Sequence, residues 1–171
     1  IVLVAIGGRS KHYYFDEESI LNQIEYFLSL YPNKEYYVFN SKRTPKSMNN
    51  KLIKLAKIKE IIFCDYKNND TSFESILHKA SAKLITRDSV NMIFESLSCK
   101  GNTYLVDMKI KNKMNKVVRT INNLIEQKKI GHIDQSDMVD GLSATKIYKQ
   151  NVYNDVFAEV EKVAYKLNQL I

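Results

Sequence analysis

Short apolar runs and longer apolar stripes alternate along this chain. Five of the runs consist mainly of β-branched and aromatic residues, which is typical of strands buried on both faces of a sheet. These predicted strands are residues 1–6, 36–40, 61–64, 83–86 and 103–106. Between them, apolar residues recur at spacings of three and four, the period of a helix with one buried face. The predicted helices are residues 17–30, a segment after Pro45, a segment after Thr71 or Ser72, a segment after Asp88 or Ser89, and residues 115–128.

Repeated strand–helix units indicate the fold class. They predict an α/β fold with a Rossmann-like open parallel sheet of five to six strands and helices on both faces, joined by right-handed crossovers. Residues 131–143 show the weakest pattern, and we expect a loop or partial linker there. The stretch 144–170 predicts a long final helix whose apolar stripe is Val152, Val156, Val160, Val163, Leu167 and Leu170. We therefore divide the chain into a Rossmann-like domain at 1–133 and a loop and helix at 134–171 that pack on the same domain.

The composition suits one globular domain. The chain has 171 residues, 44% of them hydrophobic, enough for a substantial core. No apolar run approaches the roughly 20 residues of a membrane span, and we expect no signal peptide. Cys64 and Cys99 lack CxxC spacing and His neighbours, which favours free thiols and a cytoplasmic location. The three histidines are widely spread, so we predict no metal site. Because Ile1 opens directly into a predicted strand, we expect a fragment or a processed product.

The net charge of +7 comes almost entirely from lysine, with 22 lysines against 4 arginines. A basic domain is one feature of nucleic-acid-binding proteins. Here the lysines are scattered among Asn and Ile, and the densest cluster, Lys109, Lys111, Lys113 and Lys116, has no interleaved aromatic residue. We interpret this cluster as a solvated loop, with an anionic contact as the alternative. We do not expect nucleic acid as a partner.

Three of the four arginines, Arg9, Arg43 and Arg87, each follow a predicted strand. In an open parallel sheet the loops after the strands share one edge, and ligands bind along that edge. Lysine already supplies solvated positive charge, so guanidinium at this edge suggests a planar, multi-donor role for which phosphate is the obvious anion. Coincidence among so few residues is the alternative interpretation.

The first two of these loops carry further groups that suit a diphosphate. Gly7 and Gly8 allow a tight turn and the close approach of a ligand to the backbone, although the GxGxxG fingerprint is absent. The segment 41–45, Ser-Lys-Arg-Thr-Pro, combines hydroxyls and cations at the start of a helix, whose free N–H groups favour anions. A plain turn and a capped helix with solvated cations are the structural alternatives.

The third loop leads into a helix with an acid one and a half turns further on. Asp88 and Ser89 can cap this helix, and the neighbouring N–H groups can face a phosphate. Glu95 lies off the apolar face, where a carboxylate can accept two hydrogen bonds from a ribose diol. The alternative is that Asp88 is only a cap and Glu95 only a surface acid.

Together, the three loops resemble a known family. GG-x-SKH after the first strand, S-x-RTP after the second and T-x-DS-x-x-M-x-x-E at the fourth helix are similar to motifs of glycosyltransferase-like proteins. That family includes the plant mitochondrial-fission proteins and bacterial proteins often labelled nucleoside-diphosphate-sugar epimerases. The resemblance covers about residues 1–133 and implies the C-terminal, donor-binding half of a GT-B fold. The epimerase label has no support, because the dinucleotide fingerprint is absent.

The resemblance implies a donor site built from loop residues and helix starts. The implied residues are Gly7, Gly8, Ser10 and His12 near the diphosphate or sugar, Arg43 and Thr44 on phosphate, Asp88 and Ser89 at the helix-start anion site, and Glu95 on ribose. The chain departs from the family pattern at three positions. Arg87 replaces a usual acid, and Lys100 and Asn102 occupy the expected Gly and Pro positions.

The function expected from these observations is the binding of a nucleoside-diphosphate sugar as the donor of a GT-B-like glycosyltransferase. The resemblance implies no cofactor and no metal, and it implies an N-terminal acceptor domain of the same protein as the partner that supplies the general base. We expect Arg43, Gly8 and Ser89 to converge on one pocket. One alternative is a non-enzymatic interaction domain related to the organelle-fission proteins. We expect no transmembrane segment, and the sequence leaves peripheral membrane contact open.

Overall fold

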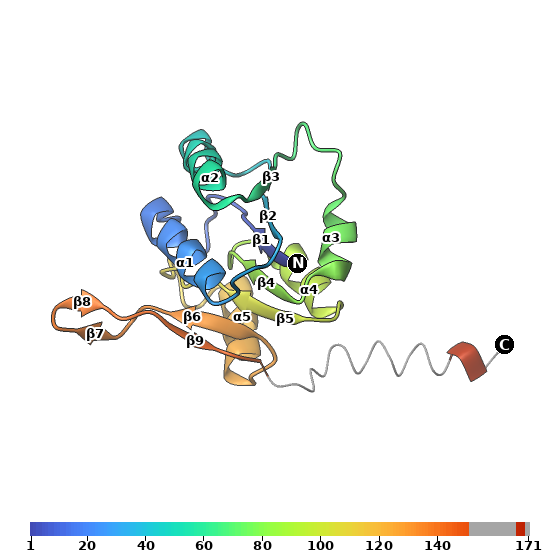
Figure 1. Ribbon diagram of the computed structural model, residues 1–171. Coiled ribbons are helices and arrows are strands. Elements are labelled where there is room, and N and C mark those ends of the chain that lie inside the picture. Colours follow the sequence, from blue (N-terminus) through green and yellow to red (C-terminus); the bar gives the residue numbers. More distant parts are fainter. Residues whose placement is uncertain (151–166, 170–171) are drawn as a thin grey trace.

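The computed structural model describes residues 1–150 and 167–169 and contains a seven-stranded, mostly parallel sheet (Figure 1). The strand order is β3-β2-β1-β4-β5-β6-β9, and only β9 is antiparallel to its neighbour. The strands of this sheet are β1 (Val2–Ala5), β2 (Tyr36–Phe39), β3 (Ile62–Cys64), β4 (Ala82–Ile85), β5 (Asn102–Leu105), β6 (Gly131–Asp134) and β9 (Lys146–Tyr148). The helices among these residues include α1 (Glu17–Ser29), α2 (Lys46–Lys59), α3 (Phe73–Lys79), α4 (Val90–Leu97) and α5 (Lys116–Glu126). The predicted α/β, Rossmann-like class is confirmed.

The central strands are buried on both faces, as their unbroken apolar runs predict. Val2, Val4 and Ile6 pack toward α1 and α2, whereas Leu3 and Ala5 pack toward the helices of the opposite face, α3, α4 and α5. Successive side chains of a strand alternate between faces, so each face takes every second residue.

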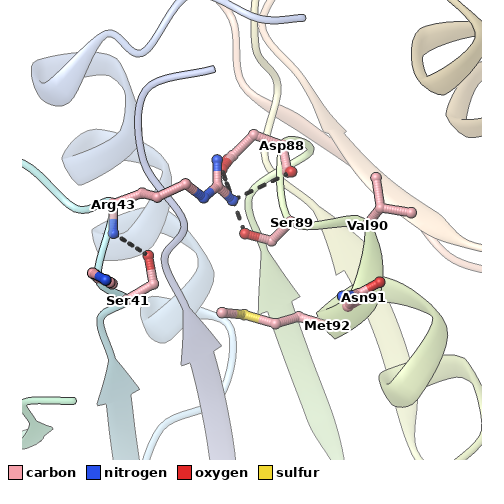
Figure 2. A pocket seen from close by; sticks show the side chains of 8 residues that line it. Ser41, Arg43, Asp88, Ser89, Val90, Asn91 and Met92 are labelled. Carbon is pink, nitrogen blue, oxygen red and sulfur yellow. Dashed lines mark hydrogen bonds and ion pairs between the residues drawn. The ribbon is translucent and has the colours of Figure 1, made fainter. Parts of the chain in front are cut away.

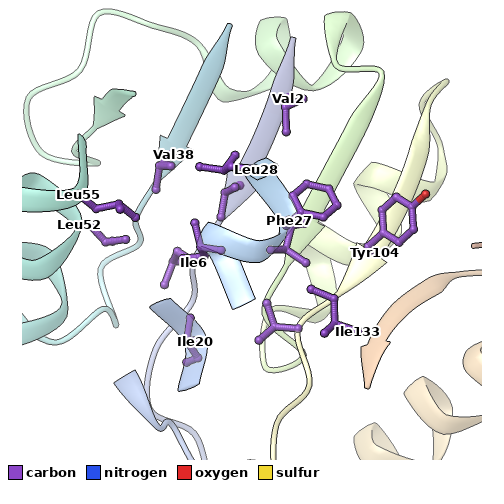
Figure 3. Packing of buried hydrophobic residues seen from close by; sticks show 14 of the residues in the cluster. Val2, Ile6, Ile20, Phe27, Leu28, Val38, Leu52, Leu55, Tyr104 and Ile133 are labelled. Carbon is purple, nitrogen blue, oxygen red and sulfur yellow. The ribbon is translucent and has the colours of Figure 1, made fainter. Parts of the chain in front are cut away.

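Phe27 on α1 is a central member of the core cluster on the side of the sheet that α1 and α2 cover (Figure 3). Its ring lies 5.4 Å from the ring of Tyr104 on β5, with the two planes at 62°. This edge-to-face geometry is favourable for aromatic pairs, and it joins α1 to the middle of the sheet.

Polar residues set the starts of three helices. The side chain of Asp16 accepts the Ser19 N–H at the start of α1, and Ser72 accepts the Ser75 N–H at the start of α3. Asn115 accepts the N–H groups of Val117 and Val118 at the start of α5. These bonds satisfy donors that a helix leaves unpaired, and they explain why each helix begins there.

The prediction of a loop or linker at residues 131–143 is wrong. β6 pairs parallel with β5, and residues 138–143 form the hairpin of β7 (Met138–Val139) and β8 (Leu142–Ser143), which projects away from the main sheet (Figure 1). Of the four residues of β6, Ile133 is the one large aliphatic side chain buried in the core, so hydropathy alone gives little signal. Asp140 and Gly141 have positive φ angles of 51° and 77° at the hairpin turn, where Asp-Gly is a favoured pair.

The predicted final helix is wrong at residues 146–148, which form β9 instead. β9 pairs with β6, so Tyr148 lies opposite His132, and their rings stack at 4.9 Å. Most of the predicted apolar stripe, from Val152 to Val163, lies outside the described residues, whereas residues 167–169 are helical. The main sheet therefore has seven strands rather than five or six.

The strand order places the candidate loops together. β1 lies between β2 and β4, and the chain crosses from one side of β1 to the other between β3 and β4. Ligands of open α/β sheets bind outside the carboxyl ends of the strands at such a reversal of order. The loops after β1, β2 and β4 all start at this position. Among the described residues, no helix has both the length and the apolar character needed to cross a membrane.

Candidate functional site

A cavity of about 340 Å³ lies at the carboxyl ends of β2 and β4 (Figure 2). We call it the sheet-edge pocket. Its lining residues come from the loop after β2 and from the start of α4: Ser41, Lys42, Arg43, Asp88, Ser89, Val90, Asn91 and Met92. The pocket therefore joins two of the three loops singled out from the sequence.

The turn after β1 packs directly against these two loops. The Gly7 N–H donates to Thr86 Oγ1 at 2.8 Å, and the Gly8 N–H donates to Asp88 Oδ2 at 2.9 Å. A Cβ atom on Gly7 would overlap the side chains of Asp88 and Ser89, and one on Gly8 would overlap the backbone carbonyl of Arg43. Glycine is needed at both positions because three loops meet there, rather than because of an unusual φ angle.

One carboxylate oxygen connects the predicted site residues. Asp88 Oδ2 accepts the Gly8 N–H and forms an ion pair with Arg43 Nη2 at 2.9 Å. The Ser89 hydroxyl donates to the same oxygen at 3.4 Å. Gly8, Arg43 and Ser89 thus meet at one carboxylate oxygen, and of the three only Arg43 and Ser89 line the pocket itself. Asp88 departs from its expected capping role, since its side chain holds the turn and the guanidinium instead.

The guanidinium of Arg43 reaches across from the loop after β2 to the end of β4 (Figure 2). It donates to the carbonyl oxygens of Arg9 at 3.4 Å and Asp88 at 3.5 Å. The Arg43 side chain is 46% exposed, whereas that of Asp88 is fully buried. A guanidinium has five N–H donors, so Arg43 is fixed on its buried side and keeps donors toward solvent.

The start of α4 contributes backbone donors to the pocket. No side chain of the described residues caps this helix at Ser89. The first N–H groups of an α-helix have no intrahelical acceptor and carry partial positive charge. Because residues 90–92 line the pocket, these groups, Arg43 and Lys42 make its wall suitable for an anion.

Thr44 lies in the same loop but is buried, and it shapes the site from behind. Its hydroxyl donates to the carbonyl of Gly7 at 2.5 Å and accepts the Ser41 N–H at 2.9 Å. The neighbouring Ser41 hydroxyl accepts the Arg43 N–H at 3.3 Å. Thr44 therefore ties the loop after β2 to the loop after β1, and phosphate contact by Thr44 stays a prediction.

Three other predicted residues lie outside the lining of the sheet-edge pocket. The Ser10 hydroxyl accepts the N–H groups of His12 and Tyr13, forming a local turn. His12 is half-buried, and its Nδ1 has no hydrogen-bond partner among the described residues. Glu95 is exposed on α4, one turn beyond Asn91, and lines a separate cavity against α3. Contacts of these residues with a nucleotide sugar remain predictions.

Only one of the three strand-following arginines lines the pocket. Arg9 is exposed and contributes its carbonyl oxygen to Arg43. Arg87 is buried and turns away, because its Nε donates to the carbonyl of Val106 at 2.8 Å and its Nη2 lies 3.5 Å from Asp107 Oδ1. Burial lowers the pKa of Arg87, and the Asp107 carboxylate opposes that shift. Arg87 is thus part of a structural ion pair.

The sequence reasoning missed several lining residues. Lys42, Asn91 and Met92 line the pocket, yet they drew attention only as members of their motifs. A signal for Asn91 and Met92 is present in the sequence, because the residues that follow a predicted N-cap carry free backbone N–H groups at the start of the helix. No group of three or more His, Cys, Asp or Glu side chains within residues 1–150 and 167–169 is arranged to hold a metal ion.

A comparison with protein families gives a match over nearly the whole chain. The sequence model of the mitochondrial fission ELM1 family matches residues 1–170. This chain belongs to the mitochondrial fission ELM1 family. The predicted resemblance to fission proteins is thus confirmed, and the family match extends beyond the residue 133 limit inferred from the motifs. No curated protein and no solved structure is similar to this ELM1-family chain in the same comparisons.

Proposed function

We propose that this chain is the donor-binding domain of a GT-B-like glycosyltransferase and that the sheet-edge pocket binds the diphosphate of a nucleoside-diphosphate sugar. The single observation that supports the proposal best is the convergence of Arg43, the Gly8 turn and the uncapped start of α4 where the strand order reverses.

The charges of the pocket fit a diphosphate that carries about two negative charges. Lys42 and Arg43 contribute two cations, and the Asp88 carboxylate offsets one of them. The backbone N–H groups of α4 add partial positive charge. Because Asp88 is held on the buried side of the guanidinium, the exposed donors of Arg43 stay available to phosphate oxygens.

The proposed reaction is a displacement at the anomeric carbon of the sugar. An acceptor oxygen attacks that carbon while the bond from it to the diphosphate breaks, and negative charge develops on the leaving group. Arg43 and the α4 N–H groups stabilise this charge through fixed donors. Under this proposal the general base comes from an N-terminal acceptor domain, so this chain alone binds the donor without turning over an acceptor.

Isothermal titration calorimetry with a panel of nucleoside diphosphates and their sugar conjugates tests the proposal. We expect at least one to bind, and we expect Arg43→Ala to weaken its affinity by about tenfold or more through the loss of a charged phosphate contact. Arg119→Ala is the matched control, because Arg119 is exposed on α5, outside the lining of the sheet-edge pocket. Failure of every nucleotide to bind, or equal losses in both variants, would contradict the proposal.

The family match favours one second candidate, a non-enzymatic interaction domain. The β7–β8 hairpin projects from the sheet with Val139 59% and Leu142 73% exposed, which is a feature of interaction surfaces. Replacing both residues by serine distinguishes the candidates. Intact folding and nucleotide binding would support the donor-binding role. An absence of nucleotide binding, combined with loss of a protein partner in the double variant, would support the interaction domain.

A further inference from the structure

A second cavity, of about 460 Å³, lies between α3 and the end of α4. It shares no lining residue with the sheet-edge pocket. Its lining residues are Glu74, Leu77, His78, Glu95, Ser98 and Cys99. A thiol, an imidazole and two carboxylates therefore face one hollow, and the proposed nucleotide chemistry does not use the thiol or the imidazole.

Three of these side chains follow one another in a line, and we call them the thiol cluster: Cys99, His78 and Glu74. Cys99 Sγ lies 3.6 Å from His78 Nδ1, and His78 Nε2 lies 3.9 Å from Glu74 Oε1. In the tautomer that carries its proton on Nε2, the imidazole presents a lone pair on Nδ1 to the thiol. A base beside a thiol, with a carboxylate beyond it, is the arrangement that activates a sulfur nucleophile.

Hydrogen bonds from a buried lysine fix the backbone around Cys99. The ammonium group of the fully buried Lys83 donates to the carbonyl oxygens of Ser96 at 2.7 Å, Lys100 at 2.9 Å and Cys99 at 3.3 Å. These bonds fix the end of α4 and with it the position of the Cys99 side chain against His78. Burial raises the pKa of the Cys99 thiol, an effect that nearby Lys83 opposes. The group is therefore protonated at neutral pH and needs a base to react.

We propose that Cys99 is a modification site that forms a mixed disulfide with small, positively charged disulfides. The thiol proton passes to His78 Nδ1 while Sγ attacks one sulfur of the reagent. The new Sγ–S bond forms as the S–S bond of the reagent breaks, and the departing thiolate takes the bonding electron pair and then a proton. Cys99 is oxidised and one half of the reagent is reduced, so no further oxidant is needed.

The charge of the cavity sets its preference among reagents. Glu74 and Glu95 both line it with exposed carboxylates. Among the described residues, no lysine or arginine lines this cavity, and the buried Lys83 points its ammonium group at backbone carbonyls. A cationic disulfide is therefore attracted and an anionic one repelled, by a factor that falls as salt screens the carboxylates.

Cys64 offers an internal control in the same chain. It is only 2% exposed at the end of β3, whereas Cys99 is half-buried and lines a cavity. In a folded protein the reagent therefore reaches Cys99 and not Cys64. Labelling of Cys64 in any variant reports that the variant has unfolded.

The experiment follows mixed-disulfide formation on the full chain by intact-mass and peptide-mapping mass spectrometry. Cystamine is the cationic reagent and oxidised glutathione is the anionic one. The rate of each reagent with Cys99 is divided by its rate with an unstructured cysteine peptide. We expect Cys99 to prefer cystamine by about tenfold at low salt and to show a smaller preference in Glu95→Gln, in which Glu74 still lines the cavity. We expect His78→Gln to slow the cystamine reaction by about tenfold, with Cys64 unlabelled throughout.

Equal relative rates with the two reagents in the parent protein would by themselves overturn the proposed preference for cationic disulfides. An unchanged rate in His78→Gln would overturn the role of the base. Both results are independent of nucleotide binding, so this inference and the proposed function can fail separately.

Discussion

Replacing Gly8 by alanine tests the packing of the three loops that build the sheet-edge pocket. The added Cβ would overlap the backbone oxygen and carbon of Arg43 and lie 2.8 Å from its Cβ. Because backbone cannot rotate out of the way, the loop after β2 must retreat by more than about 1 Å, at an overpacking cost of about 1–3 kcal/mol. The retreat also strains the bonds from Gly8 to Asp88 and from Thr44 to Gly7, each worth about 1 kcal/mol.

We therefore expect Gly8→Ala to lower the free energy of unfolding by about 3 kcal/mol. Urea denaturation followed by far-UV circular dichroism measures this loss. Gly141→Ala is the control, because its Cβ would meet no atom within 4 Å and only its φ of 77° costs about 1 kcal/mol. A Gly8 variant as stable as the parent, or no less stable than the Gly141 variant, would refute the packing argument.

Three further predictions concern buried polar groups around the sheet, and urea titrations check each of them. Burial lowers the pKa of Lys83 from 10.5 to about 8. Unfolding therefore takes up a proton between those pH values, and this group makes the free energy of unfolding rise with pH across that window. Lys83→Met should lack that rise, and an identical pH dependence in the parent and the variant would contradict this prediction. Asp107→Asn should cost about 2 kcal/mol, because it leaves the buried Arg87 without its carboxylate partner, a loss moderated by the 29% exposure of Asp107; an unchanged midpoint would show that the ion pair has no net effect. Thr44→Val should cost about 2 kcal/mol by leaving the Ser41 N–H and the Gly7 carbonyl unpaired, and a neutral effect would mean that water replaces both bonds.

The sequence predicts the central part of the fold well, because there each strand is an apolar run and each helix has a single apolar face. β1, for example, is buried on both sides, and its residues alternate between two cores. The prediction fails at the edge of the sheet. β6 contributes one large buried aliphatic residue, Ile133, and β9 has alternating exposed and half-buried residues. The edge strand β9 and its neighbour β6 are therefore defined by their pairing with other strands rather than by hydropathy.

The site was predictable at the level of loops but not at the level of individual side chains. The strand order brings Gly8, Arg43 and Ser89 together, as the sheet-edge rule predicts. The directions of side chains depend on tertiary contacts that spacing does not encode. Asp88 therefore binds the glycine turn instead of capping α4, and Arg87 pairs with Asp107 on the other side of the loop.

Buried polar residues show the same limit. Lys83 lies within a strand whose pattern predicts a core position, and it is fully buried, as expected of that position. Its long side chain reaches three carbonyl oxygens at the end of α4, a partner set that only the packed structure reveals. A charged residue in an apolar strand is thus a signal for a buried hydrogen-bonded network, although its partners cannot be read from the sequence.

A nuclear magnetic resonance titration tests the central claim most directly. The ¹⁵N-labelled chain is titrated with the nucleoside diphosphate that binds best, and backbone amide shifts are followed residue by residue. We predict saturable shifts concentrated at Gly8, Arg43 and Ser89 and in the first turn of α4, with a titration midpoint that rises by about tenfold or more in Arg43→Ala. Saturable shifts centred on other residues, or no shifts with any nucleotide, would contradict the central claim.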